Sequence, residues 1–456
     1  MNRPTNTAPR RTRFHSITSI AKLASWRWRE HWFLLLVTAI GMIAAVMIVC
    51  TVPVFSQVTQ TAALRGVLNA TPTSSEILLR ANATGLSTQS VEDTYQPTRA
   101  PFSAHLSSYL VGSPHFDFRT PDFSVLSPKL GAFNGPMGMY GASMQESAAH
   151  ITLTQGRLPQ TSSQNIEIAI TPETARLFHV SIDSIITLDT PFFAQPAASS
   201  FARGISGSPI PLQLNLYVVG LFHVKAGDPY WHQDNFLPEL AQCDGCVPHY
   251  VALASSQGLL SALDAIAARH SAPEVFFASV SPTQLYWYYR LDSTRISIDQ
   301  LGDLIGRLHA LQTSINVTFG DPAMVFSYPY IASVDVSGSV LSAANVPSAL
   351  EKFRSYLAAQ RIPSSVLAAE ITCLLLFFLS IMTTLLVDRQ VEAITLMRGR
   401  GASNRQIFGS LMTQSVVLGL IALVVGPFLA LLAVSLITAR LLPSAEQNAL
   451  NVITSA

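Results

Sequence analysis

Two cysteines in the middle of the chain have the spacing best suited to covalent or metal chemistry. Cys243 and Cys246 are separated by two residues, and His232 and His249 flank them. We expect the pair to lie outside the membrane, for reasons of topology given below, and disulfides persist there. The interpretation we favour is therefore a disulfide between the two thiols that closes a small loop. A Cys2His2 zinc site is the alternative, although the spacing matches no strong zinc pattern. Thioredoxin-like redox activity is less expected because no βαβ pattern surrounds the pair.

Recognisable catalytic motifs are missing from the sequence. It contains no G-x-x-x-x-G-K-[ST], no H-E-x-x-H and no G-x-S-x-G, and its scattered His, Asp and Glu residues suggest no paired acid and base. The aromatic run at residues 286–289 fits a strand packed into a core, or a site for an apolar ligand. We therefore expect that the chain is not an enzyme and uses no cofactor.

The composition predicts that part of the chain lies in lipid. Hydrophobic residues make up 49% and charged residues only 12% of the sequence, whereas soluble domains carry about 25% charge. Three apolar segments, at residues 33–55, 363–387 and 407–439, are long enough to cross a hydrocarbon core of ~30 Å as helices. The first is longer than the apolar core of a secretory signal, which favours an uncleaved anchor. Pro427 should kink the third.

Arginines set the expected topology. They cluster before the first span and again at residues 388–406, between the second and third spans, and positive loops stay in the cytoplasm. We therefore expect a multi-pass plasma-membrane protein with a cytoplasmic N-terminus (1–32), an extracytoplasmic domain (56–362) and an extracytoplasmic tail (440–456). Within the N-terminus, residues 16–31 fit either an interfacial amphipathic helix or a disordered basic tail.

The large extracytoplasmic domain is predicted to be α+β, and to contain two subdomains. Apolar alternation and β-branched residues predict strands, and helical spacing predicts helices, some of them as stalks beside the membrane. The expected strands are 75–79, 166–170, 212–224 and 274–280; the expected helices are 172–178, 257–268 and 298–311, with stalks at 56–68 and 349–360. Residues 91–145 and 189–211 show no clear period, so we expect loops or hinges there.

The loop between the second and third spans has the pattern of a sharp elbow. Its sequence, DRQVEAITLMRGRGASNRQ, covers residues 388–406. Gly399 and Gly401 relax the backbone and should end a short helix. Ser403 and Gln406 form an S-x-x-Q capping box, which satisfies free N–H groups at a helix start. The expected structure is helix, tight turn, helix.

This elbow resembles the cytoplasmic loop of FtsX-like permease domains. The matching positions are Arg389, Glu392, Leu396, Arg398, Gly401, Ala402, Ser403 and Gln406. Residues 151–188, with ITLTQGRLP, IEIAI and ARLFHVSIDSIITL, resemble MacB-like periplasmic core domains, and LYVVGLF at 216–222 is similar to the strand that follows. The segment 181–184 departs from the pattern, because that family often has a glycine before the acidic residue.

The resemblance implies the permease subunit of an FtsX/MacB-like ABC transporter. In that family a separate ABC ATPase contacts the elbow, two permease units share one ATPase pair as a homo- or heterodimer, and each unit has four spans. This sequence ends shortly after the third span, so we expect a fragment or a split permease that lacks the last transmembrane helix.

Two alternatives stay open. First, the elbow fits a plain membrane hairpin whose arginines only keep the loop in the cytoplasm. Second, the whole chain fits a non-transport sensor, adhesion protein or regulator of envelope enzymes. The formal net charge of +1 gives no reason to expect a nucleic-acid partner. The transported substrate does not follow from the sequence.

Overall fold

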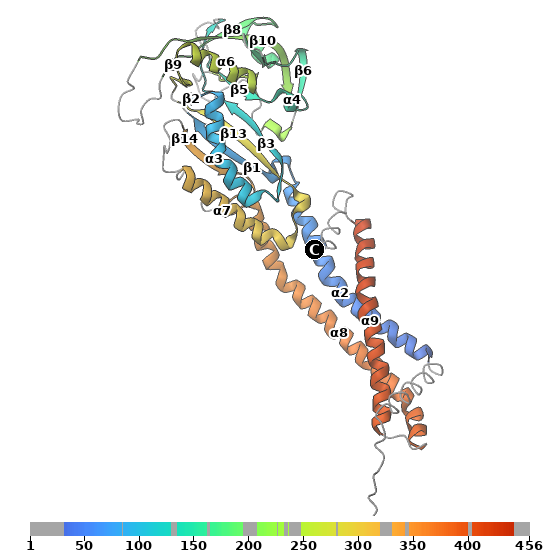
Figure 1. Cartoon of the computed structure of the whole chain (residues 1–456). Coiled ribbons are helices and arrows are strands. Elements are labelled where there is room, and N and C mark those ends of the chain that lie inside the picture. The colour runs from blue at the N-terminus through green and yellow to red at the C-terminus, as the bar shows by residue number, and fades with distance from the viewer. Residues whose placement is uncertain are drawn as a thin grey trace, which may run out of the picture. The chain divides into compact units, whose positions relative to one another are not determined.

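The structure is a computed structural model of the 456-residue chain (Figure 1). It describes residues 32–83, 85–128, 135–161, 165–194, 208–225, 227–231, 236, 248–279, 281–319, 331–342, 346–399 and 404–441. The chain divides into two compact units. We call Met1–Ala63 with Ser355–Ala456 the helical unit, and Leu64–Arg354 the sheet unit.

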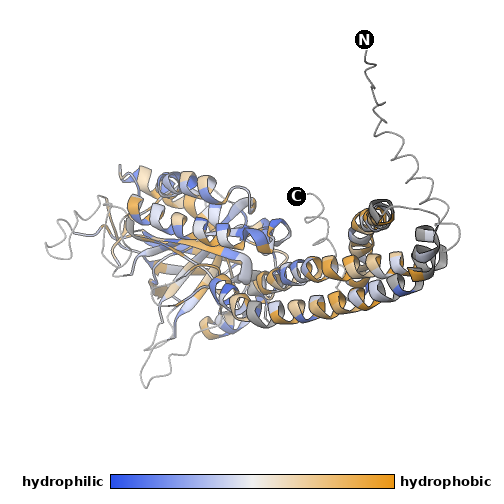
Figure 2. Cartoon of the chain, turned by 90° about the horizontal axis from the view of Figure 1, so that it is seen from below, coloured by the Kyte–Doolittle hydropathy of each residue, from blue (hydrophilic) through white to orange (hydrophobic). Residues whose placement is uncertain are grey.

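Long apolar helices build the helical unit. They are α2 (Trp32–Leu68), α8 (Ala349–Gly399) and α9 (Asn404–Leu441), and α2 and α8 continue into the sheet unit. Each contains a stretch long and apolar enough to cross a membrane, as their predominantly hydrophobic colouring in Figure 2 illustrates. The three predicted spans therefore lie in these helices. The predicted stalks are not separate elements, because they continue α2 and α8 without a break.

Within the helical unit, small residues let α9 approach α2 closely. A methyl group added at Gly426 would lie 2.6 Å from Val46 Cγ1, and one added at Gly419 would lie 3.8 Å from Met42. Ala422 and Ala430 are almost fully buried, and they are four residues before and after Gly426 on the same helix face. Without a hydrophobic driving force between helices in lipid, such close contact is a main source of association.

A large mixed sheet forms the centre of the sheet unit. In the described residues its order is β14-β1-β13-β3-β5-β11-β7-β10-β8-β4, with β6 also paired to β10. The pairs β10–β7 and β11–β5 are parallel, and the other pairs are antiparallel. The strands are β1 (Glu76–Ala83), β3 (Leu110–Arg119), β4 (Ser124–Ser127), β5 (Met137–Ala142), β6 (Ile151–Gly156), β7 (Ile166–Ile170), β8 (Ile185–Asp189), β10 (Gln213–Val224), β11 (Tyr250–Ser255), β13 (Thr283–Leu291) and β14 (Ile331–Ser337). A small second sheet has the order β2-β12-β9, formed by Gly85–Leu86, Val275–Phe277 and Phe192–Phe193.

Helices cover this sheet in two groups. The first group is α3 (Thr88–Leu106) and α7 (Leu301–Phe319), which contact each other, while α7 also contacts β14 (Figure 1). The second is α5 (Pro172–Phe178) and α6 (Ser256–Arg269), which contact the other half of the sheet. The short elements are α4 (Met144–Ser147), η1 (Pro72–Ser75), η2 (Pro229–Trp231), η3 (Ser293–Arg295) and η4 (Ile298–Gln300).

Buried aromatic residues join these layers into a core. Phe102 of α3 stacks on Tyr289 of β13 with 3.8 Å between ring centroids. Further along the sheet, Trp231 of η2 packs edge-on against Tyr140 of β5 and Phe236. The aromatic run at 286–289 lies in β13, and its residues 287–289 are buried. The core interpretation of that run is therefore confirmed for Trp287 and Tyr289, whereas Tyr288 also lines a pocket described below.

Several sequence predictions for this unit agree with the structure and one is wrong. The strand at 166–170 and the helix at 172–178 have the predicted bounds, and β10 and α6 differ from theirs by one residue at each end or less. Residues 91–145 were expected to be irregular, but most of α3, together with β3, β4, β5 and the start of α4, lies there. Most of the predicted loop at 189–211 lies outside the described residues.

Candidate functional site

The structure has a helix on each side of the predicted elbow turn, and residues 400–403 between them lie outside the described residues. α8 ends at Gly399 and α9 begins at Asn404. Ser403 thus directly precedes α9 and Gln406 is its third residue, which are the positions a capping box requires. Arg389, Glu392, Leu396 and Arg398 belong to the C-terminal part of α8, while Gly401, Ala402 and Ser403 lie outside the described residues. The side chains of the coupling residues are likewise outside the description, so their roles stay predictions.

The predicted cysteine site also lies outside the described residues. This holds for Cys243, Cys246 and His232. His249 is described, and its Nδ1 lies 2.8 Å from Asp122 Oδ2. Both the disulfide and the zinc interpretation therefore remain predictions. In the described ranges no group of three or more His, Cys, Asp or Glu side chains is arranged to hold a metal ion.

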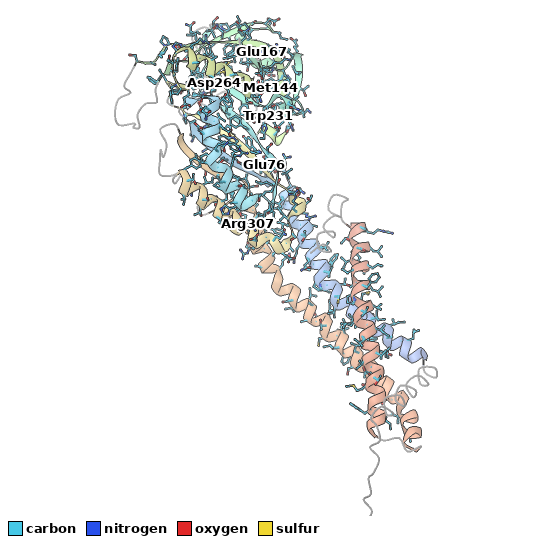
Figure 3. The ribbon with its side chains drawn as sticks, viewed as in Figure 1. Glu76, Met144, Glu167, Trp231, Asp264 and Arg307 are labelled. Atoms are coloured by element: carbon cyan, nitrogen blue, oxygen red, sulfur yellow. The ribbon has the colours of Figure 1, made fainter. Side chains whose placement is uncertain are left out.

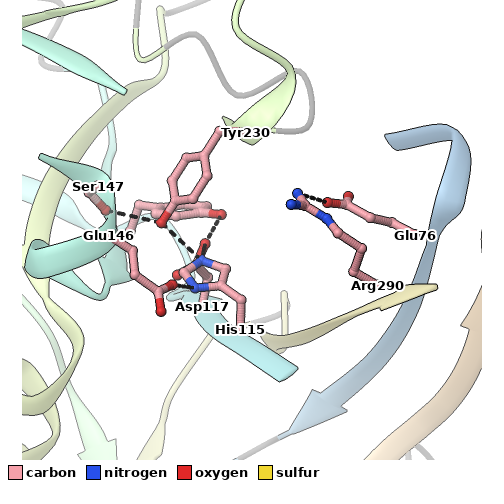
Figure 4. A network of polar contacts seen from close by, with 8 residues as sticks. Glu76, His115, Asp117, Glu146, Ser147, Tyr230 and Arg290 are labelled. Carbon is pink, nitrogen blue, oxygen red and sulfur yellow. Dashed lines mark hydrogen bonds and ion pairs between the residues drawn. The ribbon is translucent and has the colours of Figure 1, made fainter. Parts of the chain in front are cut away.

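The sheet unit contains a pocket that the sequence did not predict. Its volume is about 510 Å³, and its lining side chains come from β1, β3, β13, α4 and η2 and from the segments beside them. Polar and aromatic side chains predominate among them, and Figure 4 shows the network of polar contacts that some of them form. In Figure 3, the labelled Glu76 is one of the lining residues, and the labelled Trp231 directly follows the lining Tyr230 in η2.

His115 lies at the centre of the polar network in this pocket. Its Nε2 is 2.9 Å from Asp117 Oδ2 and 3.1 Å from the Tyr230 hydroxyl, and its Nδ1 faces the Glu146 carboxylate (Figure 4). Asp117 is fully buried and also accepts a hydrogen bond from the Tyr140 hydroxyl over 2.9 Å. One imidazole thus joins strand β3 to helix α4 and to η2.

The pKa of His115 reflects competition between burial and charge. Burial alone lowers the pKa, because it disfavours the imidazolium form. The hydrogen bond and the charge of Asp117, followed by the charge of Glu146, outweigh burial and raise the pKa above its ordinary value. The carboxylates around His115 therefore favour its imidazolium form.

A stacked aromatic pair forms another part of the pocket. The rings of Tyr230 and His150 are parallel within 4°, with 4.0 Å between centroids. His150 Nδ1 lies 2.8 Å from Asp228 Oδ2, and the Tyr230 backbone N–H donates to Asp228 Oδ1 over 3.0 Å. Burial raises the pKa of the Tyr230 hydroxyl, so it stays protonated at neutral pH. The Asp228 carboxylate thus holds both members of the pair in place.

Glu76 and Arg290 form an ion pair at the pocket. Arg290 Nη2 donates to Glu76 Oε1 over 3.1 Å, and the two residues are directly opposite each other on β13 and β1. Burial of the Glu76 carboxyl raises its pKa, which the hydrogen bond and charge of Arg290 only partly offset. The guanidinium is more than half exposed, so Arg290 stands at the rim rather than inside.

This arrangement offers fixed polar and aromatic groups to a ligand. Ser147 contacts the Tyr230 hydroxyl at 3.4 Å, and in the described residues no imidazole hydrogen-bonds to its Oγ as a base would. The network instead fixes carboxylates, imidazoles and aromatic faces around a cavity of ordinary ligand size. A sequence signal for part of it exists. His115 and Asp117 alternate along one strand, which places both on the same face.

Comparison with known families assigns the C-terminal part of the chain. Residues 365–455 match the model of the FtsX-like permease C-terminal domain. The matched range includes the span in α8, the elbow and α9, so the resemblance to FtsX-like permeases predicted from the elbow is confirmed. The chain is a membrane protein with a large α+β domain between its first and second apolar helices.

Other comparisons add little. Among solved structures, the chain is similar to the extracellular domain of the noncanonic ABC-type transporter YknZ from Gram-positive bacteria. The identity is 7% and the TM-score 0.22, with 53% of this chain and 95% of that chain covered. Since the TM-score is this low, the likeness carries no argument, and the MacB-like reading of residues 151–188 stays a prediction. No curated protein matches the chain.

Proposed function

We propose that this chain is the permease subunit of an ABC transporter, and that a separate ATPase subunit moves its elbow at residues 388–406. The match of residues 365–455 to the FtsX-like permease domain carries this proposal, because it includes the elbow, all of α9 and α8 from residue 365 onward. The chain itself hydrolyses no ATP in this account. The arginines of the elbow hold it in the cytoplasm, where the ATPase has access to it.

The attachment of α8 to the sheet unit supports transmission of motion along that helix. The Ser348 side chain accepts a hydrogen bond from the Glu351 backbone N–H over 3.1 Å, and Glu351 Oε2 accepts one from the Ser348 N–H over 2.8 Å. The Ala349 N–H donates to the Ser339 carbonyl oxygen over 2.9 Å. α8 thus starts at a fixed point of the sheet unit and continues without a break to the elbow at Gly399.

The end of α2 has an equivalent attachment. Arg65 is buried, and its guanidinium donates to the carbonyl oxygens of Thr294 and Ile296 over 2.6 and 3.3 Å. Two helices that enter the sheet unit are therefore anchored where they meet it. In our proposal, movement of the elbow reaches the extracytoplasmic domain through these helices, for export, extraction or mechanotransmission. The account further includes a cytoplasmic N-terminus and a second permease unit.

Copurification tests the proposal. A tagged chain isolated from native membranes in mild detergent should retain an ATP-hydrolysing partner, and Glu392→Arg or Arg398→Glu should remove it. Arg440→Glu, at the opposite end of α9, is the matched charge reversal and should leave the partner bound. Unchanged association in both elbow variants, or equal loss in the control, would contradict a coupling role for the elbow.

A sensor, adhesion protein or regulator of envelope enzymes is the second candidate function. The polar pocket of the sheet unit favours it, because a sensor needs a ligand site outside the membrane. This candidate predicts that no ATPase copurifies with the wild-type chain, so the same experiment separates the two functions.

A further inference from the structure

We infer that the pocket around His115 and Tyr230 binds the ammonium group of an organic amine, with an apolar part of the ligand lying on the Tyr230–His150 pair. This inference goes beyond the proposed function and does not depend on it. The pocket lies wholly within the sheet unit. Its occupation is a matter of direct binding, which needs no ATPase.

Charge is the first argument for a cationic ligand. Glu76, Glu146 and Asp228 line the pocket, and the Asp117 carboxylate is buried behind His115. In the part of the chain that the structure describes, these four carboxylates outnumber the permanent cations named beside them. One of those cations is Arg290 at the rim, and the other is Lys225, whose Nζ donates to the Ala149 carbonyl oxygen. With neutral imidazoles the pocket therefore carries net negative charge, which attracts cations and repels anions.

A buried acceptor atom without a hydrogen bond gives the second argument. Asp117 Oδ2 is occupied by His115 and by the Tyr140 hydroxyl, whereas Asp117 Oδ1 accepts no hydrogen bond within the described parts of the chain. The whole residue is inaccessible to solvent. A buried carboxylate oxygen without a donor is costly. Additional positive charge in the pocket would lower that cost.

Aromatic faces provide the third argument. Tyr230 is stacked on His150, and Tyr288 is stacked on His115 with 5.9 Å between ring centroids. The face of a tyrosine ring carries partial negative charge, so it attracts an ammonium group and also packs against apolar groups. Carboxylates beside aromatic faces therefore select a cation attached to an apolar body. In the described residues the side chains do not converge as a metal ion would require, which favours an organic cation over a metal.

Protonation of His115 should compete with the ligand. The titratable groups that face His115 are Asp117 on its own strand, Glu146 on α4, Tyr230 on η2, Tyr288 on β13 and Glu76 on β1. Below its raised pKa, His115 supplies the positive charge that these carboxylates attract. Above that pKa the imidazole is neutral, and an incoming ammonium replaces its charge. Amine binding should therefore tighten as the pH rises through the pKa of His115.

Binding to the purified full chain in detergent tests the inference, with calorimetry or Trp231 fluorescence as the readout. Three probes share one phenyl body: phenethylamine, phenethyl alcohol and hydrocinnamate. We expect the amine to bind, and the alcohol and the anion to bind at least about tenfold more weakly. Phenylalanyl-alanine amide and its N-acetyl form separate a peptide N-terminus from a free amine as the source of the ammonium group.

Variants locate the site. Glu146→Gln should weaken amine binding about tenfold, because it removes a half-exposed carboxylate at the pocket without emptying the core. Glu173→Gln, a similarly exposed acid outside the pocket, is the matched control and should change nothing. His115→Gln should flatten the dependence of amine binding on pH. Absence of amine binding to the wild type, equal binding of hydrocinnamate, or full binding by Glu146→Gln would overturn the inference.

Discussion

The buried guanidinium of Arg65, near the C-terminal end of α2, donates to the Thr294 carbonyl oxygen over 2.6 Å. The two residues are separated by 229 positions in the sequence. A second bond from Arg65 reaches the carbonyl oxygen of Ile296. One side chain thus donates to two backbone carbonyl oxygens at η3, which is far from it in the sequence. It secures the end of an apolar helix to the sheet unit.

Replacement of Arg65 should therefore destabilise the sheet unit. Hydrogen bonds to a charged group contribute about 1.5–3 kcal/mol each, so loss of both in Arg65→Ala should lower the free energy of unfolding by roughly 3–6 kcal/mol. Arg65→Lys should cost less, because an ammonium retains the charge but not the fork of donors. Urea unfolding of the full chain in detergent, followed by tryptophan fluorescence, measures the change. The exposed Arg176→Ala on α5 is the control, and an equal loss there would contradict the prediction.

Substitution of Gly426 should separate α2 from α9. A methyl group at this position would lie 2.6 Å from Val46 Cγ1 and 2.8 Å from Val46 Cβ, and the branched valine has little freedom to move aside. Gly426→Leu should lower the midpoint of thermal unfolding in detergent by several degrees. Gly41→Ala provides the matched control, since a methyl group there meets nothing within 4 Å. If both variants melt together with the wild type, α9 does not depend on this contact.

The G-R-L-P segment that begins with the last residue of β6 should stabilise the fold through its glycine more than through its arginine. Gly156 has φ +75°, and a methyl group there would lie 2.2 Å from the Val219 carbonyl oxygen. Arg157 forms a bidentate pair with Glu167 over 2.5 and 2.6 Å, but its side chain is about half exposed to solvent. Exposed ion pairs contribute about 0–1 kcal/mol. Urea unfolding should therefore show a larger loss for Gly156→Ala than for Arg157→Ala, and the reverse order would refute this assignment.

Glu274 should make the stability of the sheet unit depend on pH. The pKa of its carboxyl is raised to about 7, mainly by burial. A hydrogen bond with Ser90 lowers the pKa and the charge of Asp93 raises it, but both effects are smaller than that of burial. The folded state then binds a proton that the unfolded state releases above about pH 4.5, so this contribution is fully present below that pH. It is lost as the pH rises to about 7, and amounts to roughly 3 kcal/mol.

Unfolding titrations at several pH values test this contribution. Glu274→Gln cannot ionise, so the fall in stability between about pH 4.5 and about pH 7 should become smaller in the variant than in the wild type. At about pH 8 the variant should be the more stable of the two. Glu92→Gln, on an exposed position of α3, should retain the wild-type slope. A Glu274→Gln slope identical to that of the wild type would show that this carboxyl ionises normally in the folded chain.

Local signals explain which elements followed from the sequence. The helix at Pro172–Phe178 begins with Thr171, whose side chain accepts a hydrogen bond from the Thr174 N–H, and with proline at a position that needs no donor. The opposite case is α3, which contains Pro97 and Pro101 and was expected to be irregular. There the burial of Phe102 and Leu106 against the sheet outweighs the poor local preference.

The pocket lay beyond sequence reasoning for a different reason. Its lining residues are far apart in the sequence, from Glu76 to Arg290, and the pairing of distant strands brings them together. The antiparallel register of β1 and β13 places Glu76 opposite Arg290, although 214 positions separate them. Tyr230 and His115 meet only because η2 packs over β3. Alternating His115 and Asp117 was the one local sign, and a single such pair is too common to identify a site. The membrane helices, by contrast, followed from length and hydropathy alone.

In the proposed function, residues 388–406 face the cytoplasm, where an ATPase can move them. The direct measurement is labelling of Ser403→Cys with a membrane-impermeant maleimide, in a chain whose four native cysteines are replaced. Glu92→Cys in the same cysteine-free background reports whether the sheet unit is accessible from outside the cell. We predict that intact cells label Glu92→Cys at once, and label Ser403→Cys only after permeabilisation. Rapid labelling of Ser403→Cys in intact cells would place the elbow outside and contradict the account.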